Sequence, residues 1–344
     1  MSAQKDLNVG IIGCGMIGTD HLRTLTEAVS GSRVWAVSDA DPARAAQAVE
    51  QVDPTIKIHT DPHALISDPD IDAVLVASTE ETHEQFVLAC LAAAKPVLCE
   101  KPLAPTAEAC LRVVEAEAQV GRKLVQIGYM RRFDPSYVEM KRVLDSGQLG
   151  EALFLHAVHR NAGYPDRYES DALITATGVH DIDIARWLLG DEIVSVTTRN
   201  PKPSALVRDG FQDPQFLILE TAGGVIVDVE IFVNAHYGYD VRCELVAERG
   251  TVSLVPPTTA SIRHSGVDGH PVLADARPRF AAAFRDELQA WVNAATNKQV
   301  CGANAWDGYA AAAVAEACLE SFGNHTRTDV RLAPRPSLYT EDDK

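Results

Sequence analysis

The chain has 344 residues, of which 46% are hydrophobic and 23% are charged, a composition typical of a soluble globular protein long enough for two domains. Its formal net charge of −17 disfavours nucleic acid or an anionic membrane surface as a partner. The sequence has neither the apolar run of about 18 residues that a membrane span needs nor a signal-type start, so we expect a cytoplasmic protein.

The first third of the chain alternates between strand-like and helix-like patterns. The strand-like runs cover residues 7–13, 33–39, 72–78, 95–102 and 123–129. They are rich in Val and Ile, apolar on both faces, and separated by helical patterns such as 83–94 and 106–121. Such an alternation indicates βαβ units with a buried parallel sheet. We therefore predict an α/β domain with a parallel sheet over residues 1–125.

A glycine-rich loop follows the first predicted strand and opens a helix. Its pattern is Gly13-x-Gly15-x-x-Gly18, with Met16 and Ile17 between the last two glycines. Glycines there permit a tight turn and a close approach of the backbone to a pyrophosphate, while the helix start offers unpaired N–H groups. We predict that all five residues contact a dinucleotide. The alternative is a glycine-rich turn that binds nothing.

Asp39 ends the second predicted strand, where a carboxylate can accept hydrogen bonds from the ribose hydroxyls of a dinucleotide. It would also repel a 2′-phosphate, and no arginine follows it directly, since Arg44 lies on the next predicted helix. The pattern therefore favours NAD over NADP. Asp39 as a helix cap is the alternative, although Asp41 is equally placed for that role.

After about residue 150 the pattern changes to consecutive strands. They cover residues 152–161, 193–200, 215–235 and 239–257, and some are joined by glycine turns. This arrangement is typical of an antiparallel sheet. Two alanine-rich helical patterns follow, about 275–296 and 302–322, and we predict an extended or loose tail over 331–344. The second predicted domain is residues 126–344.

The first of these strands contains an H-x-x-H pattern, His156 and His159, which raises the question of a metal site. Residues three apart on a strand point to opposite faces, so a joint zinc site is disfavoured and no metal is predicted. His159 shares its face with Asn161, and both are candidates to line a pocket. His156 is interpreted as structural.

Two further stretches, CEKPLA (99–104) and GYMRRFDPSYVEMK (128–141), together with the glycine loop, resemble the Gfo/Idh/MocA oxidoreductases. Within that family, the segments VHRN, VHDIDIARWLLG and YGYDVRCELV, at 158–161, 179–190 and 237–246, are most similar to those of inositol 2-dehydrogenases. The resemblance runs over almost the whole chain, with the motifs in the family's order.

The resemblance implies a Rossmann domain followed by an α/β domain with a large open, mainly antiparallel sheet, assembled as a homodimer or homotetramer. The implied reaction is reversible oxidation of a ring hydroxyl of a cyclic polyol to a ketone, with hydride transfer to NAD. Related members act on sugars and glycosides, so a sugar or glycoside dehydrogenase is one alternative. A catalytically silent NAD sensor is another.

Catalytic roles follow from the same resemblance. The ammonium group of Lys101 is expected to contact the substrate oxygen and relay its proton, and His180 to accept that proton near neutral pH. Asp183 lies on the face of His180 at helical spacing and is expected to orient the histidine or the substrate. The simpler alternatives are a surface lysine at a strand end and a local His–Asp pair at a helix start.

Further contacts are carried over from the matching motifs. The expected substrate-binding residues are Arg131, His159, Asn161, Asp183 and Tyr237. The expected cofactor contacts beyond the glycine loop and Asp39 are Ser78, Thr79, His83, Glu100 and Lys101. His83 is equally well explained as a residue that holds its loop.

One position departs from the inositol dehydrogenase pattern, which has an aspartate four residues before the histidine. Counting back from His180, that position holds Ala176, and Asp171 is too far away to replace it. Three interpretations are open: an engineered inactive variant, a natural member in which Asp183 or a substrate group takes the role, and a non-catalytic NAD-binding protein. With the glycine loop intact, we expect NAD binding together with weak catalysis.

Overall fold

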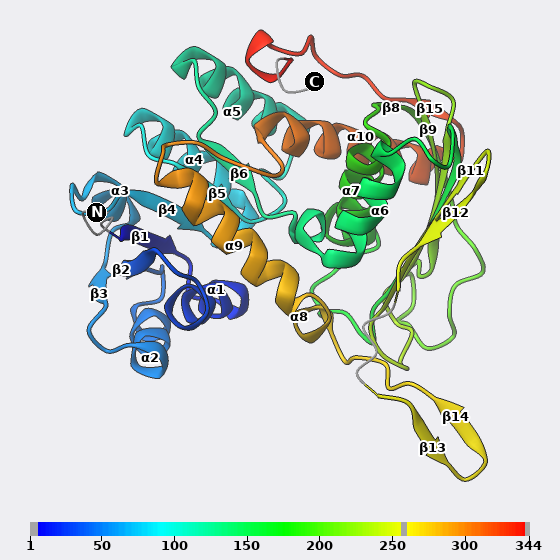
Figure 1. Cartoon of the computed structure of the whole chain (residues 1–344), viewed down its shortest axis with the longest axis horizontal. Helices are drawn as coiled ribbons and strands as arrows, with labels where there is room; N and C mark the ends of the chain where they lie inside the picture. The colour runs from blue at the N-terminus through cyan, green and yellow to red at the C-terminus, as the bar shows by residue number, and fades with distance from the viewer. Residues whose placement is uncertain (1–5, 256–259, 341–344) are drawn as a thin grey trace. The chain divides into compact units, whose positions relative to one another are not determined.

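The computed structural model describes residues 6–255 and 260–340, and the chain divides into two compact units (Figure 1). The first unit comprises Met1–Phe133, Ala282–Ala312 and Leu332–Lys344, and the second comprises Asp134–Ala281 and Ala313–Arg331. The domain ranges 1–125 and 126–344 stay a prediction. The compact units group the chain differently, because two later segments return to the first unit.

The first unit is built on a six-stranded parallel sheet with strand order β3-β2-β1-β4-β5-β6. Its strands are β1 (Leu7–Ile12), β2 (Ser32–Ser38), β3 (Lys57–His59), β4 (Ala73–Val76), β5 (Val97–Cys99) and β6 (Val125–Ile127). This is the order of a Rossmann fold, and it reverses between β1 and β4, where ligands of such sheets bind. The predicted fold of this part is confirmed.

Helices bury both faces of this sheet, so every residue of β1 is buried. The helices are α1 (Met16–Glu27), α2 (Pro42–Val52), α3 (Pro62–Ser67), α4 (His83–Ala92), α5 (Ala107–Val120), α9 (Ala281–Ala295) and the start of α10 (Ala305–Asn324), with short 3-10 turns η1 (Glu80–Thr82), η2 (Met130–Phe133) and η4 (Ser337–Tyr339). Trp291 of α9 is fully buried in the same core cluster as Leu22 and Leu25 of α1. Among residues 6–255 and 260–340, no helix combines the length and apolar character needed to cross a membrane.

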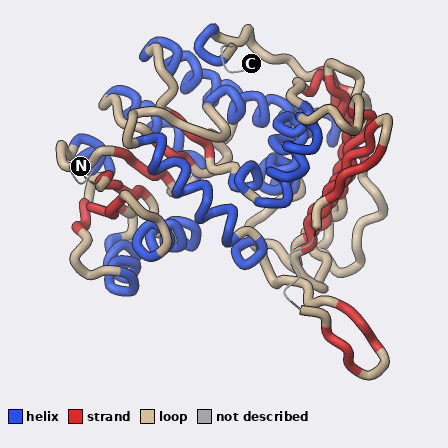
Figure 2. The backbone as a smooth tube through the Cα atoms, in the orientation of Figure 1, coloured by secondary structure: helices blue, strands red, loops and turns tan. Residues whose placement is uncertain are grey.

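The second unit is built on a seven-stranded sheet with strand order β12-β11-β7-β10-β9-β8-β15. Figure 2 shows the strands in red. Its strands are β7 (Ala152–Arg160), β8 (Ile193–Arg199), β9 (Gln215–Thr221), β10 (Ile226–Phe232), β11 (Asp240–Ala247), β12 (Gly250–Ser253) and β15 (Thr328–Asp329). The predicted antiparallel character is confirmed for all neighbours except β7 and β10, which pair in parallel. Their carboxyl ends therefore lie side by side.

The helices of the second unit are α6 (Pro135–Asp145), α7 (Val179–Leu189), the short α8 (Ala276–Arg279) and the end of α10, with a π-helical turn η3 (Leu173–Gly178) before α7. The strands alternate buried and partly exposed residues, as in a sheet with one covered face. Phe154 and Val194 are large apolar side chains left exposed. A separate hairpin, β13 (Ile262–His264) with β14 (Val267–Gly269), stands away from the large sheet (Figure 1).

The tail is extended as predicted but it is not loose where the structure describes it. Tyr339 is fully buried, and its hydroxyl donates to Glu117 Oε2 at 2.6 Å. The other carboxylate oxygen of Glu117 accepts the N–H groups of Leu124 and Val125, at 2.5 and 2.6 Å. Burial raises the pKa of Glu117, and these hydrogen bonds oppose the rise. Residues 341–344 lie outside the described residues.

We predict that Tyr339→Phe lowers the free energy of unfolding by about 1–3 kcal/mol, because it removes a donor from a buried carboxylate. Urea unfolding followed by circular dichroism measures the loss. Tyr168→Phe, which changes a partly exposed tyrosine in the same way, is the matched control. Equal effects of the two substitutions would contradict the role assigned to Tyr339.

Candidate functional site

The glycine loop between β1 and α1 has room for a ligand at one glycine only. A Cβ on Gly13, whose φ is +98°, would lie 2.4 Å from the Ala77 carbonyl oxygen, and a Cβ on Gly18 would lie 1.9 Å from that of Gly13. A Cβ on Gly15 would meet nothing within 4 Å. Gly15 directly precedes α1, whose first N–H groups have no partners within the helix. This open cradle at a helix start fits the pyrophosphate of a dinucleotide.

The other two residues of the predicted loop site differ in exposure. Met16 is 64% exposed as the first residue of α1, whereas Ile17 is partly buried. Both residues follow Gly15 in the sequence. Their contact with the cofactor stays a prediction.

Asp39 is buried at the end of β2 and holds the glycine loop. Its carboxylate accepts the Cys14 N–H at 2.7 Å and the Asp41 N–H at 2.8 Å. Asp41, not Asp39, caps α2 by accepting the Ala43 N–H. Arg44 reaches Asp39 Oδ1 at 3.4 Å, a contact that the sequence did not predict. Since this cation offsets the charge of Asp39, it weakens the repulsion of a 2′-phosphate on which a preference for NAD over NADP depends.

The loops after β4 and β5 are joined through His83, the first residue of α4. Its ring is 2% exposed, with Nδ1 2.7 Å from the Pro102 carbonyl oxygen and Nε2 3.1 Å from that of Ser78. A neutral imidazole donates through one nitrogen, so it satisfies one of these oxygens at a time. Both ring nitrogens of His83 thus face its own loops, which favours the loop-holding role. Ser78 is half-buried and Thr79 is exposed at the start of η1.

Lys101 follows β5, with Glu100 before it and Arg131 near it. Burial lowers the pKa of the Lys101 amine; the charges of Glu100 and Glu80 oppose this, and Arg131 adds to it. Arg131 is 1% exposed and lies in η2, just after β6. The charge of Arg131 thus acts on the Lys101 amine, and the two residues follow the neighbouring parallel strands β6 and β5.

The Glu100 carboxylate has partners within the protein. Its Oε1 lies 2.6 Å from His21 Nε2 of α1, and its Oε2 accepts the Lys101 N–H at 3.2 Å. Burial raises the pKa of Glu100, but the hydrogen bond and charge of His21, with smaller effects of Lys101, outweigh it and leave that pKa below its usual value. His21 is a residue of this site that sequence reasoning missed.

In the second unit, a buried polar cluster forms around His159 of β7. Its Nδ1 lies 2.8 Å from Asp181 Oδ2 of α7, and its Nε2 lies 3.2 Å from the Tyr239 hydroxyl. The ring of His180 is 6.3 Å from that of His159, centroid to centroid. Asp183 is fully buried in the same helix. The predicted candidates His159, His180 and Asp183 thus lie in one unit. The His159–Asp181 pair joins a strand to a helix, not two neighbours on one helix.

Ala176 lies in the π-helical turn η3, immediately before the helix that carries His180. The Val179 N–H donates to the Ile174 carbonyl, five residues back, which is the π pattern. A Cβ on Gly178 would lie 3.0 Å from Ile231 Cδ1, so η3 lies close against β10. Ala176 itself is half-buried. Such π turns within helices occur often at functional sites.

Asn161 and Asn234 follow the parallel neighbours β7 and β10. The two loops are joined, since the Asn161 N–H donates to Phe232 and the Asn161 carbonyl accepts from Ala235, at 3.0 and 2.9 Å. Within residues 6–255 and 260–340, the buried Asn161 Oδ1 and Asn234 Nδ2 have no hydrogen-bond partner. One amide thus offers an acceptor and the other a donor, which are the groups that a hydroxyl-rich ligand requires.

The structure does not bring Tyr237 to this cluster. It is 48% exposed, and its hydroxyl donates to Asp240 Oδ2 at 2.5 Å and accepts from Arg160 at 3.1 Å. Tyr239, two residues later, is buried against His159 instead. The chain turns at Gly238, with φ +141°, so the two tyrosines diverge. Tyr239 lies one residue before β11 and continues the alternation of buried residues along that strand.

The H-x-x-H pair lies on opposite faces of β7, as predicted. His156 is exposed, stacks on Phe154 and pairs with Asp228, whereas His159 is buried. Within the described ranges, no group of three or more His, Cys, Asp or Glu side chains is arranged to hold a metal ion.

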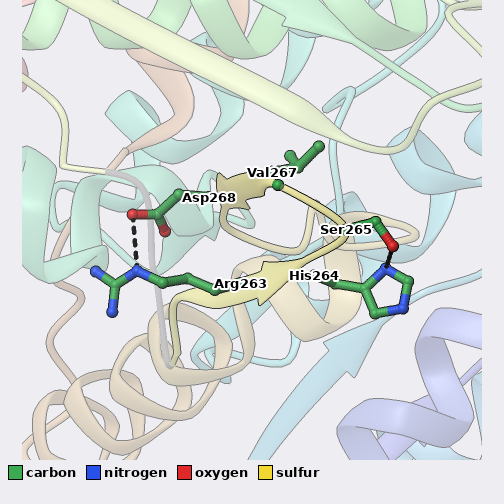
Figure 3. A pocket seen from close by; sticks show the side chains of 6 residues that line it. Arg263, His264, Ser265, Val267 and Asp268 are labelled. Carbon is green, nitrogen blue, oxygen red and sulfur yellow. Dashed lines mark hydrogen bonds and ion pairs between the residues drawn. The ribbon is translucent and has the colours of Figure 1, made fainter.

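A surface hollow lies at the tip of the β13–β14 hairpin (Figure 3). Six consecutive residues, 263–268, line it, and Arg263 pairs there with Asp268 at 3.1 Å. None of the candidate site residues contributes to it, so we do not assign a substrate to this hollow.

The chain is similar to known proteins over nearly its whole length. Residues 7–129 match the family described as "Oxidoreductase family, NAD-binding Rossmann fold", and residues 137–253 match "GFO/IDH/MocA C-terminal domain". The chain is 63% identical to inositol 2-dehydrogenase 2 of Saccharopolyspora erythraea, with 97% of this chain and 98% of that protein covered.

Two solved structures extend the similarity to three dimensions. A myo-inositol dehydrogenase from Lactobacillus casei, solved with NAD(H) and myo-inositol, is 35% identical with a TM-score of 0.93, over 97% of this chain and 100% of that one. A scyllo-inositol dehydrogenase from the same organism, solved with NAD(H) and scyllo-inositol, is 26% identical with a TM-score of 0.87, over 95% of this chain and 99% of that one.

We predict that Gly15→Ala leaves stability within about 0.5 kcal/mol of the parent but weakens NAD binding about tenfold or more, about 1.4 kcal/mol. The reason is that the added methyl group meets no protein atom, yet occupies the cradle at the start of α1. Thermal unfolding at increasing NAD concentrations measures both quantities. An unchanged stabilisation by NAD would place the pyrophosphate elsewhere.

Proposed function

Because the chain belongs to the GFO/IDH/MocA family of oxidoreductases, we propose that it oxidises one ring hydroxyl of an inositol to a ketone, with hydride transfer to NAD. The NAD-binding fold and the inositol dehydrogenase type rest on similarity over 97% of the chain. The observation that carries the substrate class is the buried polar cluster around His159, beside the unsatisfied amides of Asn161 and Asn234. A ring that carries several hydroxyls needs such a set of donors and acceptors.

Oxidation of an alcohol requires a hydride acceptor, a proton acceptor and a group that polarises the oxygen. Bound NAD supplies the hydride acceptor. We assign proton acceptance to His180, since a neutral imidazole can take a hydroxyl proton near pH 7. Its helix is held to β7 by the Asp181–His159 contact, which restricts the position of the imidazole. Asp181 therefore acts as a positioning residue.

Lys101 is assigned contact with the reacting oxygen. Its ammonium group would stabilise the negative charge that develops as the hydroxyl loses its proton. Burial lowers the pKa of this amine, which brings it closer to the pH range where it can relay a proton. Arg131, which is buried, is proposed as a substrate contact in the first unit.

The substrate contacts of the second unit are proposed to be His159, Asn161, Asp183 and Tyr239. Tyr239 replaces Tyr237 in this set because its hydroxyl lies in the cluster. The relatives act, by their names, on myo- and scyllo-inositol, so the two stereoisomers are the first substrates to compare. A sugar or glycoside is the alternative that a wider panel distinguishes. A cytoplasmic location and a homodimer or homotetramer complete the proposal.

Ala176 supports a second candidate function, a catalytically silent NAD-binding protein. An alanine offers neither an acceptor for a substrate hydroxyl nor a charge to stabilise an imidazolium. The position is half-buried and precedes His180 by one turn, so a longer carboxylate side chain there could extend toward solvent. The three interpretations of this residue, engineered, natural with compensation, or non-catalytic, lead to different outcomes of one substitution.

We predict that Ala176→Asp raises NAD-dependent polyol oxidation by about 10²–10⁴-fold, the usual contribution of a proton-handling partner. NADH absorbance is followed with myo-inositol, scyllo-inositol and a set of pyranoses. Lys101→Met in the same background should abolish the gain. No gain on any substrate that the parent oxidises slowly would contradict the missing-carboxylate hypothesis. Tight NAD binding without turnover in either form would favour the silent protein.

A second pair of variants tests which tyrosine belongs to the site. In the Ala176→Asp background, Tyr239→Phe should lower kcat/KM about fivefold, because it removes one hydroxyl from the His159 cluster at a cost of about 1 kcal/mol. Tyr237→Phe is the matched control and should change kcat/KM less than twofold, about 0.4 kcal/mol. A larger effect at Tyr237 would restore the assignment made from the sequence.

A further inference from the structure

A buried pair, His21 and Glu100, lies directly behind the segment that carries Lys101. His21 belongs to α1, the helix that begins at the glycine loop, and is 2% exposed. Its Nε2 lies 2.6 Å from Glu100 Oε1, and the ring meets Phe284 of α9 edge-on at 5.8 Å. The pair therefore joins the proposed dinucleotide-binding helix to the end of β5.

Glu100 in turn acts on Lys101 in two ways. Its second oxygen accepts the Lys101 N–H at 3.2 Å, so the carboxylate orients the lysine backbone. Its charge also acts on the lysine amine from the adjacent position. The space for the carboxylate depends on Gly128, because a Cβ there would lie 3.1 Å from Glu100 Cδ. The backbone at Glu100 is held in turn, since its N–H donates to Val76 at 2.8 Å.

We propose that His21 is a positioning residue for Lys101: by pairing with Glu100, it keeps a negative charge and a hydrogen-bond acceptor in place behind the lysine. Without His21, Glu100 keeps the Lys101 N–H as a hydrogen-bond donor but loses the imidazole, and its carboxylate shifts toward the neutral form because burial penalises the charged state. Loss of the His21 imidazole therefore removes the negative charge of Glu100 from the surroundings of Lys101, although His21 itself acts only through Glu100. This inference rests on the proposed function, since only that function gives Lys101 a chemical role.

The sign of the effect follows from the groups that face Lys101. Glu100 and Glu80 raise the pKa of its amine, whereas burial and Arg131 lower it. His21 acts on the same balance through Glu100, whose pKa it lowers. If His21 no longer holds Glu100 ionised, one of the two negative charges that raise the pKa of Lys101 is lost. The pKa of Lys101 should then fall further.

The experiment uses the whole protein with its lysines reductively methylated with ¹³C, so that each amine is titrated by NMR. Lys101→Met identifies the Lys101 signal by its absence. His21→Phe keeps an aromatic ring against Phe284 but removes the donor, and His21→Gln keeps a donor. We expect His21→Phe and Glu100→Gln to move the Lys101 midpoint about one pH unit lower. His21→Gln should lie between these variants and the parent.

The double variant His21→Phe/Glu100→Gln tests whether His21 acts through Glu100. Its midpoint should equal that of Glu100→Gln alone, and additive shifts would overturn the proposal. In the Ala176→Asp background, the pH profile of kcat should move in the same direction.

A purely structural role would lower the unfolding temperature of His21→Phe and leave the Lys101 titration where it was, which would also overturn the proposal. The NMR titration needs no turnover. Absence of polyol oxidation would therefore contradict the proposed function while the titration still decides the role of His21.

Discussion

The backbone hydrogen bonds of the first sheet continue one residue beyond its strands, and the arrangement of the first unit depends on them. The Gly13 N–H donates to Ser38, that of Ala77 to Ile12, that of Glu100 to Val76, and that of Gly128 to Cys99, all at 2.7–2.8 Å. Each of these four loops thus starts from a position fixed by the neighbouring strand. Because the strands are parallel, all four starts fall at one edge. The close approach of Gly13 to Ala77 is one result.

Beyond the backbone hydrogen bonds of the sheet, buried carboxylates hold the loops that carry candidate residues. Asp39 accepts the N–H of Cys14 in the glycine loop, and Glu100 accepts that of Lys101. In the second unit, Asp181 pairs with His159, and Asp213 accepts the Val233 N–H at 3.0 Å beside Asn234. Burial raises the pKa of Asp213 to about 6. In both units, acidic side chains hold candidate residues in place rather than presenting charge to solvent.

Features set by local periodicity were predictable, and features set by tertiary pairing were not. The parallel sheet, the glycine loop and the opposite faces of His156 and His159 follow from apolar patterns and strand geometry. The parallel pairing of β7 with β10 and the contact of His159 with Asp181 join segments distant in sequence, which no local pattern specifies. Tyr237 and Tyr239 diverge at one glycine, and a motif match alone could not choose between them.

The first unit is completed by the last parts of the chain. Trp291 lies in its core, and Tyr339 bonds to Glu117 ahead of β6. Since a ribosome releases the chain from its N-terminus at about 5–20 residues per second, the parallel sheet is made long before these residues appear. The nascent first unit must therefore persist with an incomplete core while all of the second unit is synthesised. Until those segments are made, the apolar surface that they cover in the folded unit has no partner from them.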